Sequence, residues 1–197
     1  MFRQFAIVLL LGSYDPETKS ILEYIKEEIA KSFTKNVFAF MLENLDIYNA
    51  EKIQVLTETF DVNKITLFIF QEGSLFDVYD VDLKDDPYQT VYNFLKEEYN
   101  ISKIDKLSVS DKLNLLMQFA KTIFLIRHKE ETRGGEYIEL MHALFQRQSE
   151  KIWFFKKEGI DLSEMLMEYL DKFKINIRPY RNISDLKKGI LRILDYW

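Results

Sequence analysis

Short, continuous apolar runs, separated by longer amphipathic stretches, most constrain the fold of this sequence. Runs of this length without strict alternation are typical of strands buried on both faces of a parallel sheet. The alternation with helical patterns predicts a single α/β domain over residues 1–197. Its open, mainly parallel sheet would carry flanking helices in flavodoxin-like or Rossmann-like layering. The predicted strands are "FAIVLLL" (5–11), "VFAFML" (37–42), "ITLFIF" (65–70), "TIFLI" (122–126), "IWFF" (152–155) and "INIRPY" (175–180).

Several segments carry the signals of a helix start. Asp15 and Asp86 each precede a proline, and an N-cap acceptor followed by proline favours the first turn of a helix. Ser163 or Asp161 is expected to begin the helix that contains "EMLMEYLDKF", and Ser184 the helix that contains "DLKKGILRILDYW".

One stretch, residues 65–83, interrupts this alternation. "ITLFIFQEGSLFDVYDVDL" predicts a strand, a tight turn at Glu72-Gly73 and a second, alternating strand, which together would form an antiparallel hairpin added to the parallel sheet. Oxygen-rich clusters suit hard cations, but alternating carboxylates also protect an exposed edge from pairing with another chain. We therefore predict no metal and no cofactor. The acidic residues concerned are Asp77, Asp80, Asp82, Asp85 and Asp86.

Composition narrows the classes of function. Hydrophobic residues make up 47% of the chain and charged residues 30%, which is typical of a globular protein. A net charge of -5 disfavours nucleic acid as the main partner, because binding phosphates requires concentrated Lys and Arg. Without cysteine there is no thiolate nucleophile and no disulfide. No apolar run approaches the length of a membrane span, so we predict a cytoplasmic protein without membrane contact.

The loop after the first predicted strand is one candidate ligand site. In open α/β sheets, ligands bind outside the carboxyl ends of strands. In "LLLGSYDPET", Gly12 permits close approach, Ser13 offers a hydroxyl, and Tyr14 leads to the amides of the next helix. The spacing matches neither a Walker loop nor GxGxxG, so a plain turn from strand to helix is an equal alternative.

The second candidate loop follows the strand at 122–126. Adjacent Gly134 and Gly135 would leave room for a ligand at the start of a helix. Glu136 falls in its first turn and Glu139 one turn later. The alternative is that Glu136 only interacts with the helix dipole and Glu139 lies on the solvated face. The opposite face would carry the core-facing residues Tyr137, Leu140, Met141 and Leu144.

The stretch "TIFLIRHKEETRGGEYIELMHALFQRQSEKIWFFKKEGIDLSEMLMEYL" resembles the nucleoside 2-deoxyribosyltransferase-like superfamily, which is related to TIR-type domains. The likeness rests on a strand, a glycine turn, a helix with a glutamate in its second turn, and a Ser-x-Met helix start. These features fall on Gly135, Glu139, Ala143 and Ser163-Glu164-Met165. The amino-terminal "IVLLLGSYD" is similar to the first strand and ligand loop of the group, and residues 65–100 lie outside the likeness.

The resemblance implies an enzyme of the hydrolase or transferase class that breaks an N-glycosidic bond in a nucleoside or nucleotide. Glu139 would act as the nucleophile or stabilise the sugar cation, and Arg133 would meet a phosphate. The resemblance also implies a homodimer. The expected substrate-binding residues are Gly12, Ser13, Tyr14, Arg133, Gly134, Gly135, Glu136, Ser163 and Met165.

Two positions depart from the superfamily pattern. Lys121 replaces a common aspartate, and Glu136 replaces a threonine beside the glycine. A non-catalytic nucleotide-binding or protein-interaction module with the same fold is therefore the alternative. The only two histidines are expected outside the site, His128 in a charged loop and His142 at a helix margin.

Overall fold

The computed structural model describes residues 5–33, 36–84, 86–130, 135–145 and 148–196. The chain divides into two compact units. Unit 1 comprises Met1–Met41 and Leu116–Trp197, and unit 2 comprises Leu42–Leu115, which is inserted between the two parts of unit 1. The division reflects the density of contacts within each unit. It does not test the prediction that residues 1–197 form a single domain.

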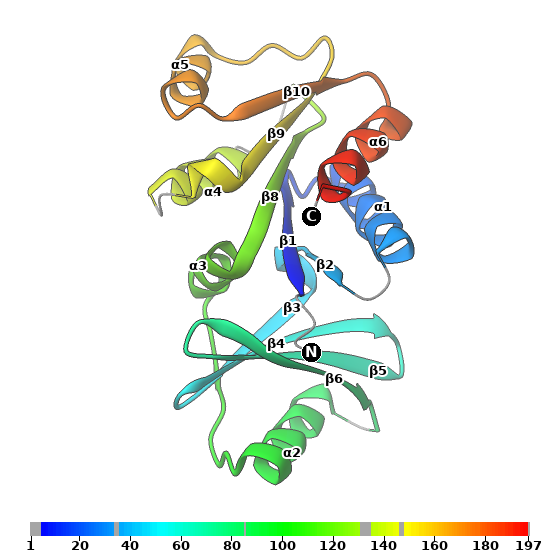
Figure 1. Ribbon diagram of the computed structural model, residues 1–197, viewed down its shortest axis with the longest axis vertical. Helices are drawn as coiled ribbons and strands as arrows, with labels where there is room; N and C mark the ends of the chain where they lie inside the picture. The colour runs from blue at the N-terminus through cyan, green and yellow to red at the C-terminus, as the bar shows by residue number, and fades with distance from the viewer. Residues whose placement is uncertain (1–4, 34–35, 85, 131–134, 146–147, 197) are drawn as a thin grey trace. The chain divides into compact units, whose positions relative to one another are not determined.

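Unit 1 contains a five-stranded parallel sheet in the order β10-β9-β8-β1-β2 (Figure 1). All seven residues of β1 are buried, as expected for a central strand covered on both faces. This confirms the predicted mainly parallel sheet, and five of the six predicted strands form it. Their bounds are β1 Ala6–Gly12, β2 Val37–Phe40, β8 Ala120–Arg127, β9 Ile152–Lys157 and β10 Asn176–Tyr180.

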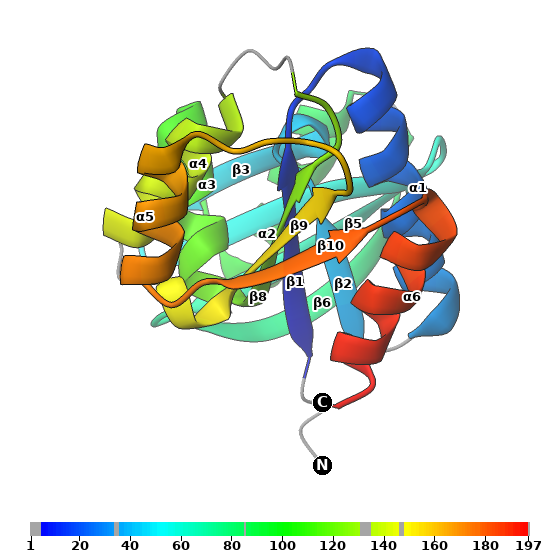
Figure 2. The ribbon, with the colours of Figure 1, turned by 90° about the horizontal axis from the view of Figure 1, so that it is seen from above.

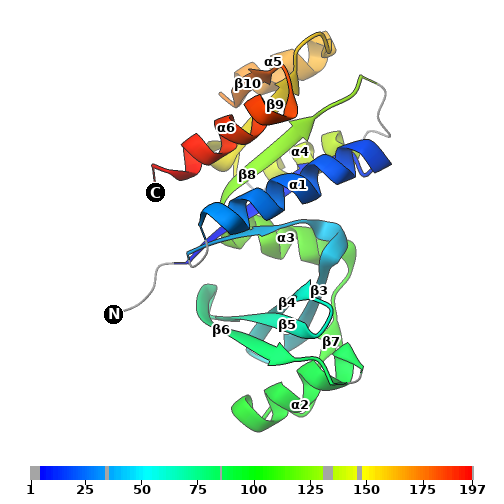
Figure 3. The same cartoon turned by 90° about the vertical axis from the view of Figure 1, so that its right-hand side faces the viewer.

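Helices cover both faces of this sheet. Figure 2 shows α1 (Pro16–Ser32) and α6 (Ile183–Leu194) on one side, and α4 (Gly135–Phe145) and α5 (Glu164–Lys172) on the other. The helices α1 and α6 lie side by side (Figure 3), and Lys187 Nζ of α6 lies 3.0 Å from Glu28 Oε2 of α1. The apolar stripe of α1 packs into the core with strand residues such as Val8 and Leu10.

The helix starts follow the predicted chemistry with one exception. Asp15 and Asp86 cap α1 and α2 (Pro87–Tyr99), as predicted, and Ser163 caps α5 by accepting a hydrogen bond from the Leu166 amide. The prediction of Ser184 as the start of α6 is wrong, since Asn182 accepts the capping bond from the Asp185 amide. Asn and Ser are both favourable N-cap residues. Because β10 ends at Tyr180, Asn182 is the first of the two to follow the strand, and α6 begins directly after it.

Unit 2 contains a separate antiparallel sheet in the order β6-β5-β4-β3-β7. The predicted hairpin is confirmed as β5 (Lys64–Gln71) and β6 (Ser74–Asp82), but its predicted addition to the parallel sheet is wrong. The hairpin pairs instead with β4 (Ile53–Asp61), which was not predicted. The helix α2 packs against this sheet through a cluster that includes Val91 and Leu95.

The remaining elements belong to both units. They are β3 (Leu45–Ala50), β7 (Asp105–Lys106), α3 (Val109–Phe119), and the 3-10 turns η1 (Leu42–Asn44) and η2 (Ser149–Lys151).

Two of the acidic residues of the hairpin, Asp77 and Asp80, have local partners. Asp80 accepts a hydrogen bond from the Thr66 hydroxyl at 2.7 Å, and Asp77 accepts one from the Val78 amide at 2.8 Å. Across the described ranges, no group of three or more His, Cys, Asp or Glu residues is placed to hold a metal ion. The same ranges contain no helix long and apolar enough to cross a membrane.

Candidate functional site

The carboxyl ends of β1 and β8 form the switch point of the parallel sheet. The chain leaves β1 for β2 on one side, and it leaves β8 for β9 on the other. In an open α/β sheet, a crevice outside the strands is expected where the order reverses in this way. Both candidate loops predicted from the sequence begin at this point, because β1 ends at Gly12 and β8 ends at Arg127.

Gly12 lies where β1 and β8 approach each other closely. It pairs with Ile126, and a Cβ atom at position 12 would lie 2.9 Å from the Ile126 carbonyl oxygen. Real Cβ atoms almost never come this close to a backbone oxygen. The packing of the two strands therefore requires glycine here, in addition to any approach by a ligand.

We expect Gly12→Ala to destabilise the protein by about 1–3 kcal/mol, because the added methyl group must push β1 and β8 apart. Urea denaturation compared with the wild type measures the effect. Lys188→Ala, at an exposed position of α6, is the control and should leave stability nearly unchanged. Unchanged stability in Gly12→Ala would contradict the close approach.

The loop after Gly12 is held by the start of α1. Ser13 is buried, and Tyr14 packs against the core of unit 1. Asp15 accepts hydrogen bonds from the amides of Glu17 and Thr18, each at 3.2 Å. Burial opposes ionisation of Asp15, but hydrogen bonds from Thr18 and from Lys129 outweigh it and hold the pKa of this carboxyl well below its usual range.

Glu139 of α4 is the most unusual carboxyl group of this site. The residue is only 7% exposed, and α4 packs against β1 and β8. The backbone amide of Gly12 donates a hydrogen bond to its carboxyl group, whereas the buried Oε2 atom has no hydrogen-bond partner among the residues that the structure describes. Burial raises the pKa of Glu139 to about 8, and the Gly12 amide offsets only part of this rise. The alternative of a solvated Glu139 is therefore wrong.

The structure describes only some of the other predicted site residues. Gly135 and Glu136 open α4, although the structure does not describe the Glu136 side chain, and Arg133 and Gly134 lie outside the described residues. The Ser163 hydroxyl is engaged in capping α5, and Met165 is 68% exposed. Among the described contacts, Glu139 is joined to Gly12 but not to Ser163 or Met165.

His128 follows β8 in a charged loop, as predicted, but its side chain is buried. Its Nδ1 lies 2.9 Å from the Tyr180 hydroxyl, and its Nε2 lies 3.1 Å from Glu17 Oε1 and 3.4 Å from Lys157 Nζ. Burial lowers the pKa of His128, and the nearby Lys157 lowers it further. With a neutral ring, we assign the proton to Nε2, which donates to the Glu17 carboxylate, while Nδ1 accepts from Tyr180.

Lys129 completes this group of charges at the start of α1. Its Nζ lies 3.0 Å from Asp15 Oδ1 and 2.8 Å from Glu17 Oε2. The ion pairs of Lys129 connect the end of β8 to α1, and the His128 ring connects it to both α1 and β10. The signal in the sequence was the position of His128, two residues after a predicted buried strand. A side chain at such a position can contact a helix that covers the sheet, here α1 through Glu17.

We expect Tyr180→Phe to destabilise the protein by about 1–3 kcal/mol, because it leaves the buried Nδ1 of His128 without its donor. Chemical denaturation at neutral pH provides the measurement. Tyr196→Phe is the matched control, since Tyr196 is 83% exposed, and it should leave stability unchanged. Equal stability of the two variants would contradict the assigned role of Tyr180.

Comparison of the sequence with models of known protein families finds no match, and comparison with curated proteins finds none either. The resemblance to the nucleoside 2-deoxyribosyltransferase-like superfamily therefore stays a prediction, and what is established is an α/β chain with a five-stranded parallel sheet flanked by helices and a separate antiparallel sheet.

Proposed function

We propose that this protein binds a nucleoside or nucleotide at the switch point of its parallel sheet and breaks its N-glycosidic bond with the help of Glu139. One observation carries the proposal. At the carboxyl edge of the sheet lies a carboxyl group that accepts a hydrogen bond from the Gly12 amide, and its buried Oε2 atom has no partner within the described part of the chain. Such a group lowers stability, and groups with strongly shifted pKa values gather at functional sites.

The chemistry of N-glycosidic cleavage fits a carboxylate in this environment. As the bond from the anomeric carbon to the base nitrogen breaks, its electron pair leaves with the base and positive charge develops on the sugar. A carboxylate oxygen beside the anomeric carbon stabilises this cation or bonds to it, and water or a second base then takes the sugar. In a buried site with few competing dipoles, this attraction is stronger than in water.

The raised pKa sets the condition under which Glu139 acts. With a pKa of about 8, the carboxyl group is mostly protonated in the free protein at neutral pH. Positive charge on the sugar favours the ionised form, because an opposite charge nearby lowers the pKa of a carboxyl group. The proposed reaction should therefore become faster as the pH rises toward about 8.

The test is release of a base from a panel of substrates. Purified protein is incubated with nucleosides, deoxynucleosides, their 5′-monophosphates and NAD, and released base or nicotinamide is separated by chromatography. Release from at least one substrate, rising with pH toward about 8, supports the proposal. Binding of a nucleotide without release from any substrate contradicts catalysis and leaves the binding module.

A non-catalytic nucleotide-binding module is the second candidate, and specific observations favour it. The Glu139 carboxyl group is protonated at neutral pH, so it can donate a hydrogen bond to a ligand rather than attack it. Ser163, which the superfamily pattern places at the ligand, already caps α5. In this case a protein with Rossmann-like layering would bind a nucleotide without cleaving it.

We also expect self-association, as the resemblance implies. Its support is three exposed apolar side chains on α4 and α5, the helices on one face of the sheet (Figure 2). Ile138 of α4 is 72% exposed, and Met165 and Met167 of α5 are 68% and 44% exposed. Light scattering should give a mass near twice 23.6 kDa. Ile138→Glu should shift the protein toward the monomer, whereas a mass near 23.6 kDa at every concentration would contradict the dimer.

A further inference from the structure

A cavity of about 580 Å³ lies in unit 1 between α6 and the strands β9 and β10. This volume is within the range of about 300–1,000 Å³ that is typical of small-molecule sites. Aromatic and basic side chains share its wall, which includes Trp153, Phe155, Arg178, Tyr180, Arg192 and Tyr196. Gly189 of α6 also lines it, and a Cβ there would lie only 3.1 Å from Phe155 Cε1. The glycine thus leaves the floor of the cavity open.

Two arginines of the cavity are free to bind an anion. The Arg178 guanidinium lies over the Trp153 ring, with its Cζ 5.2 Å from the ring centroid. This contact fixes the planar group without using its N–H donors. Among the described residues, neither Arg178 nor Arg192 forms an ion pair with a carboxylate. The acidic side chain in the wall, Asp185, is engaged by the Arg181 amide, which donates to its Oδ2 at 3.1 Å.

We propose that this cavity binds an aromatic phosphate, of which a nucleoside 5′-monophosphate is the simplest form. Trp153, Phe155 and Tyr196 offer apolar surface to a planar base, and Arg178 and Arg192 donate to the phosphate. Two cations and one carboxylate leave a net positive wall in a chain whose net charge is -5. An anion is therefore attracted to this place rather than to the surface in general.

The cavity is a second site, separate from the one proposed at Glu139. Its described lining does not include Gly12, Ser13 or Glu139. Tyr180 connects the two regions, since it lines the cavity and also bonds to His128 at the carboxyl edge of the sheet. A ligand here would thus contact the residue that holds His128 in place.

The test is calorimetric titration of the full chain with AMP, adenosine and ribose 5-phosphate. We expect AMP to bind more tightly than either of its parts, because the cavity recognises both the base and the phosphate. Arg178→Gln and Arg192→Gln should each weaken AMP binding about tenfold or more, and they should leave adenosine binding nearly unchanged. In a Trp197→Phe variant, which leaves Trp153 as the single tryptophan, quenching of fluorescence by AMP gives an independent readout at the cavity.

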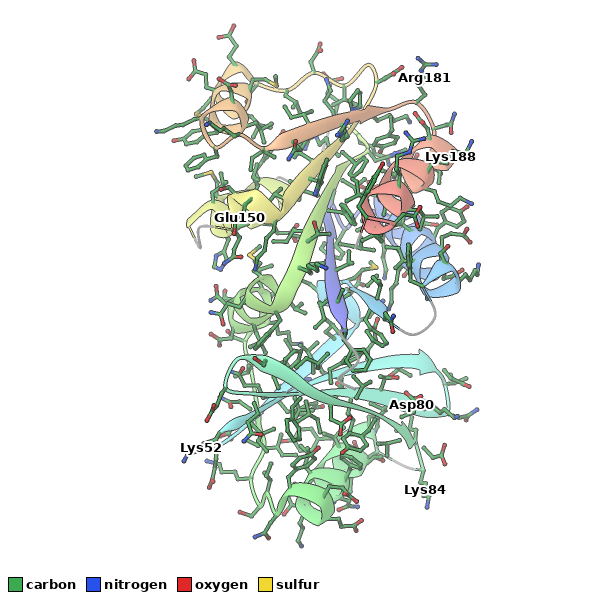
Figure 4. All side chains as sticks on the ribbon, in the orientation of Figure 1. Lys52, Asp80, Lys84, Glu150, Arg181 and Lys188 are labelled. Carbon is green, nitrogen blue, oxygen red and sulfur yellow. The ribbon has the colours of Figure 1, made fainter. Side chains whose placement is uncertain are left out.

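Arg181→Gln is the matched control. Arg181 extends into solvent between β10 and α6 (Figure 4), it is paired with Glu158 at 3.3 Å, and it does not line the cavity. Its loss should leave AMP binding unchanged. AMP binding that is as tight in both arginine variants as in the wild type would overturn this proposal. No AMP binding at millimolar concentration would overturn it outright. The first proposal is tested separately by the release of base, which depends on Glu139.

Discussion

Glu139→Gln is expected to lower the rate of base release roughly 100- to 1,000-fold, the range measured when one group that stabilises developing charge is removed. Glutamine keeps nearly the same shape, but it cannot carry the negative charge that stabilises the sugar cation. The affinity for the substrate should change much less, because the charge acts mainly in the transition state. Single-turnover release and equilibrium binding measure the two effects separately.

The matched control for this experiment is Glu168→Gln, which removes an equivalent charge from the exposed surface of α5. It should retain the wild-type rate. If Glu139→Gln also retains the wild-type rate, Glu139 is not the carboxylate of the reaction. Glu136, in the first turn of the same helix, is then the next residue to replace.

The second large effect expected of Glu139→Gln is a gain in stability at alkaline pH. Folding raises the pKa of Glu139 from 4.5 to about 8, so the folded protein binds a proton that the unfolded chain has lost. Stability therefore falls as the pH rises from about 4.5 to about 8. The loss is about 1.4 kcal/mol per pH unit in the middle of this range and smaller at both ends, where one of the two states is only half titrated, so the total is roughly 4 kcal/mol. Glutamine has no proton to lose, so the variant avoids this destabilisation.

Urea denaturation at pH values from about 5 to about 8 measures this difference. The two proteins should have similar stability at the acid end, and the variant should be more stable by roughly 4 kcal/mol at the alkaline end. Other titrating groups, including His128, are the same in both proteins and cancel in the difference. A difference that does not depend on pH would contradict the raised pKa. Glu168→Gln should show no gain, because its carboxyl group is exposed.

If both effects are observed, they would describe a site that lowers the stability of the protein in order to act. A buried carboxyl group with one unpartnered oxygen is costly in the folded state. Ground-state destabilisation of this kind is common where activity depends on a strained or desolvated group. A stabilising but inactive Glu139→Gln would separate this case from a carboxyl group that is merely tolerated in the core.

Local patterns were sufficient for most elements of unit 1. Continuous apolar runs such as 5–11 and 122–126 predicted β1 and β8, because a strand covered on both faces has no polar alternation. An acidic cap followed by proline likewise predicted the starts of α1 and α2, since both act on the backbone of their own first turn.

Local patterns did not predict which strand pairs with the hairpin. The turn at Glu72-Gly73 was evident, but the strand that pairs with β5 was not, because β4 mixes Gln, Thr and Glu with its apolar residues. Which sheet a strand joins is decided by long-range pairing. The sequence therefore predicted the hairpin and placed it in the wrong sheet.

The sequence by itself determined that Glu139 lies on a helix after a glycine turn, and that Gly12 ends the first strand. Only the tertiary structure decided the state of these groups. Packing of α4 against β1 and β8 removes water from Glu139 and raises its pKa, and the approach of the Ile126 carbonyl makes Gly12 necessary. His128 likewise became buried only when β8, α1 and β10 met around it. Desolvation depends on atoms from distant parts of the chain, and no local spacing of residues contains that information.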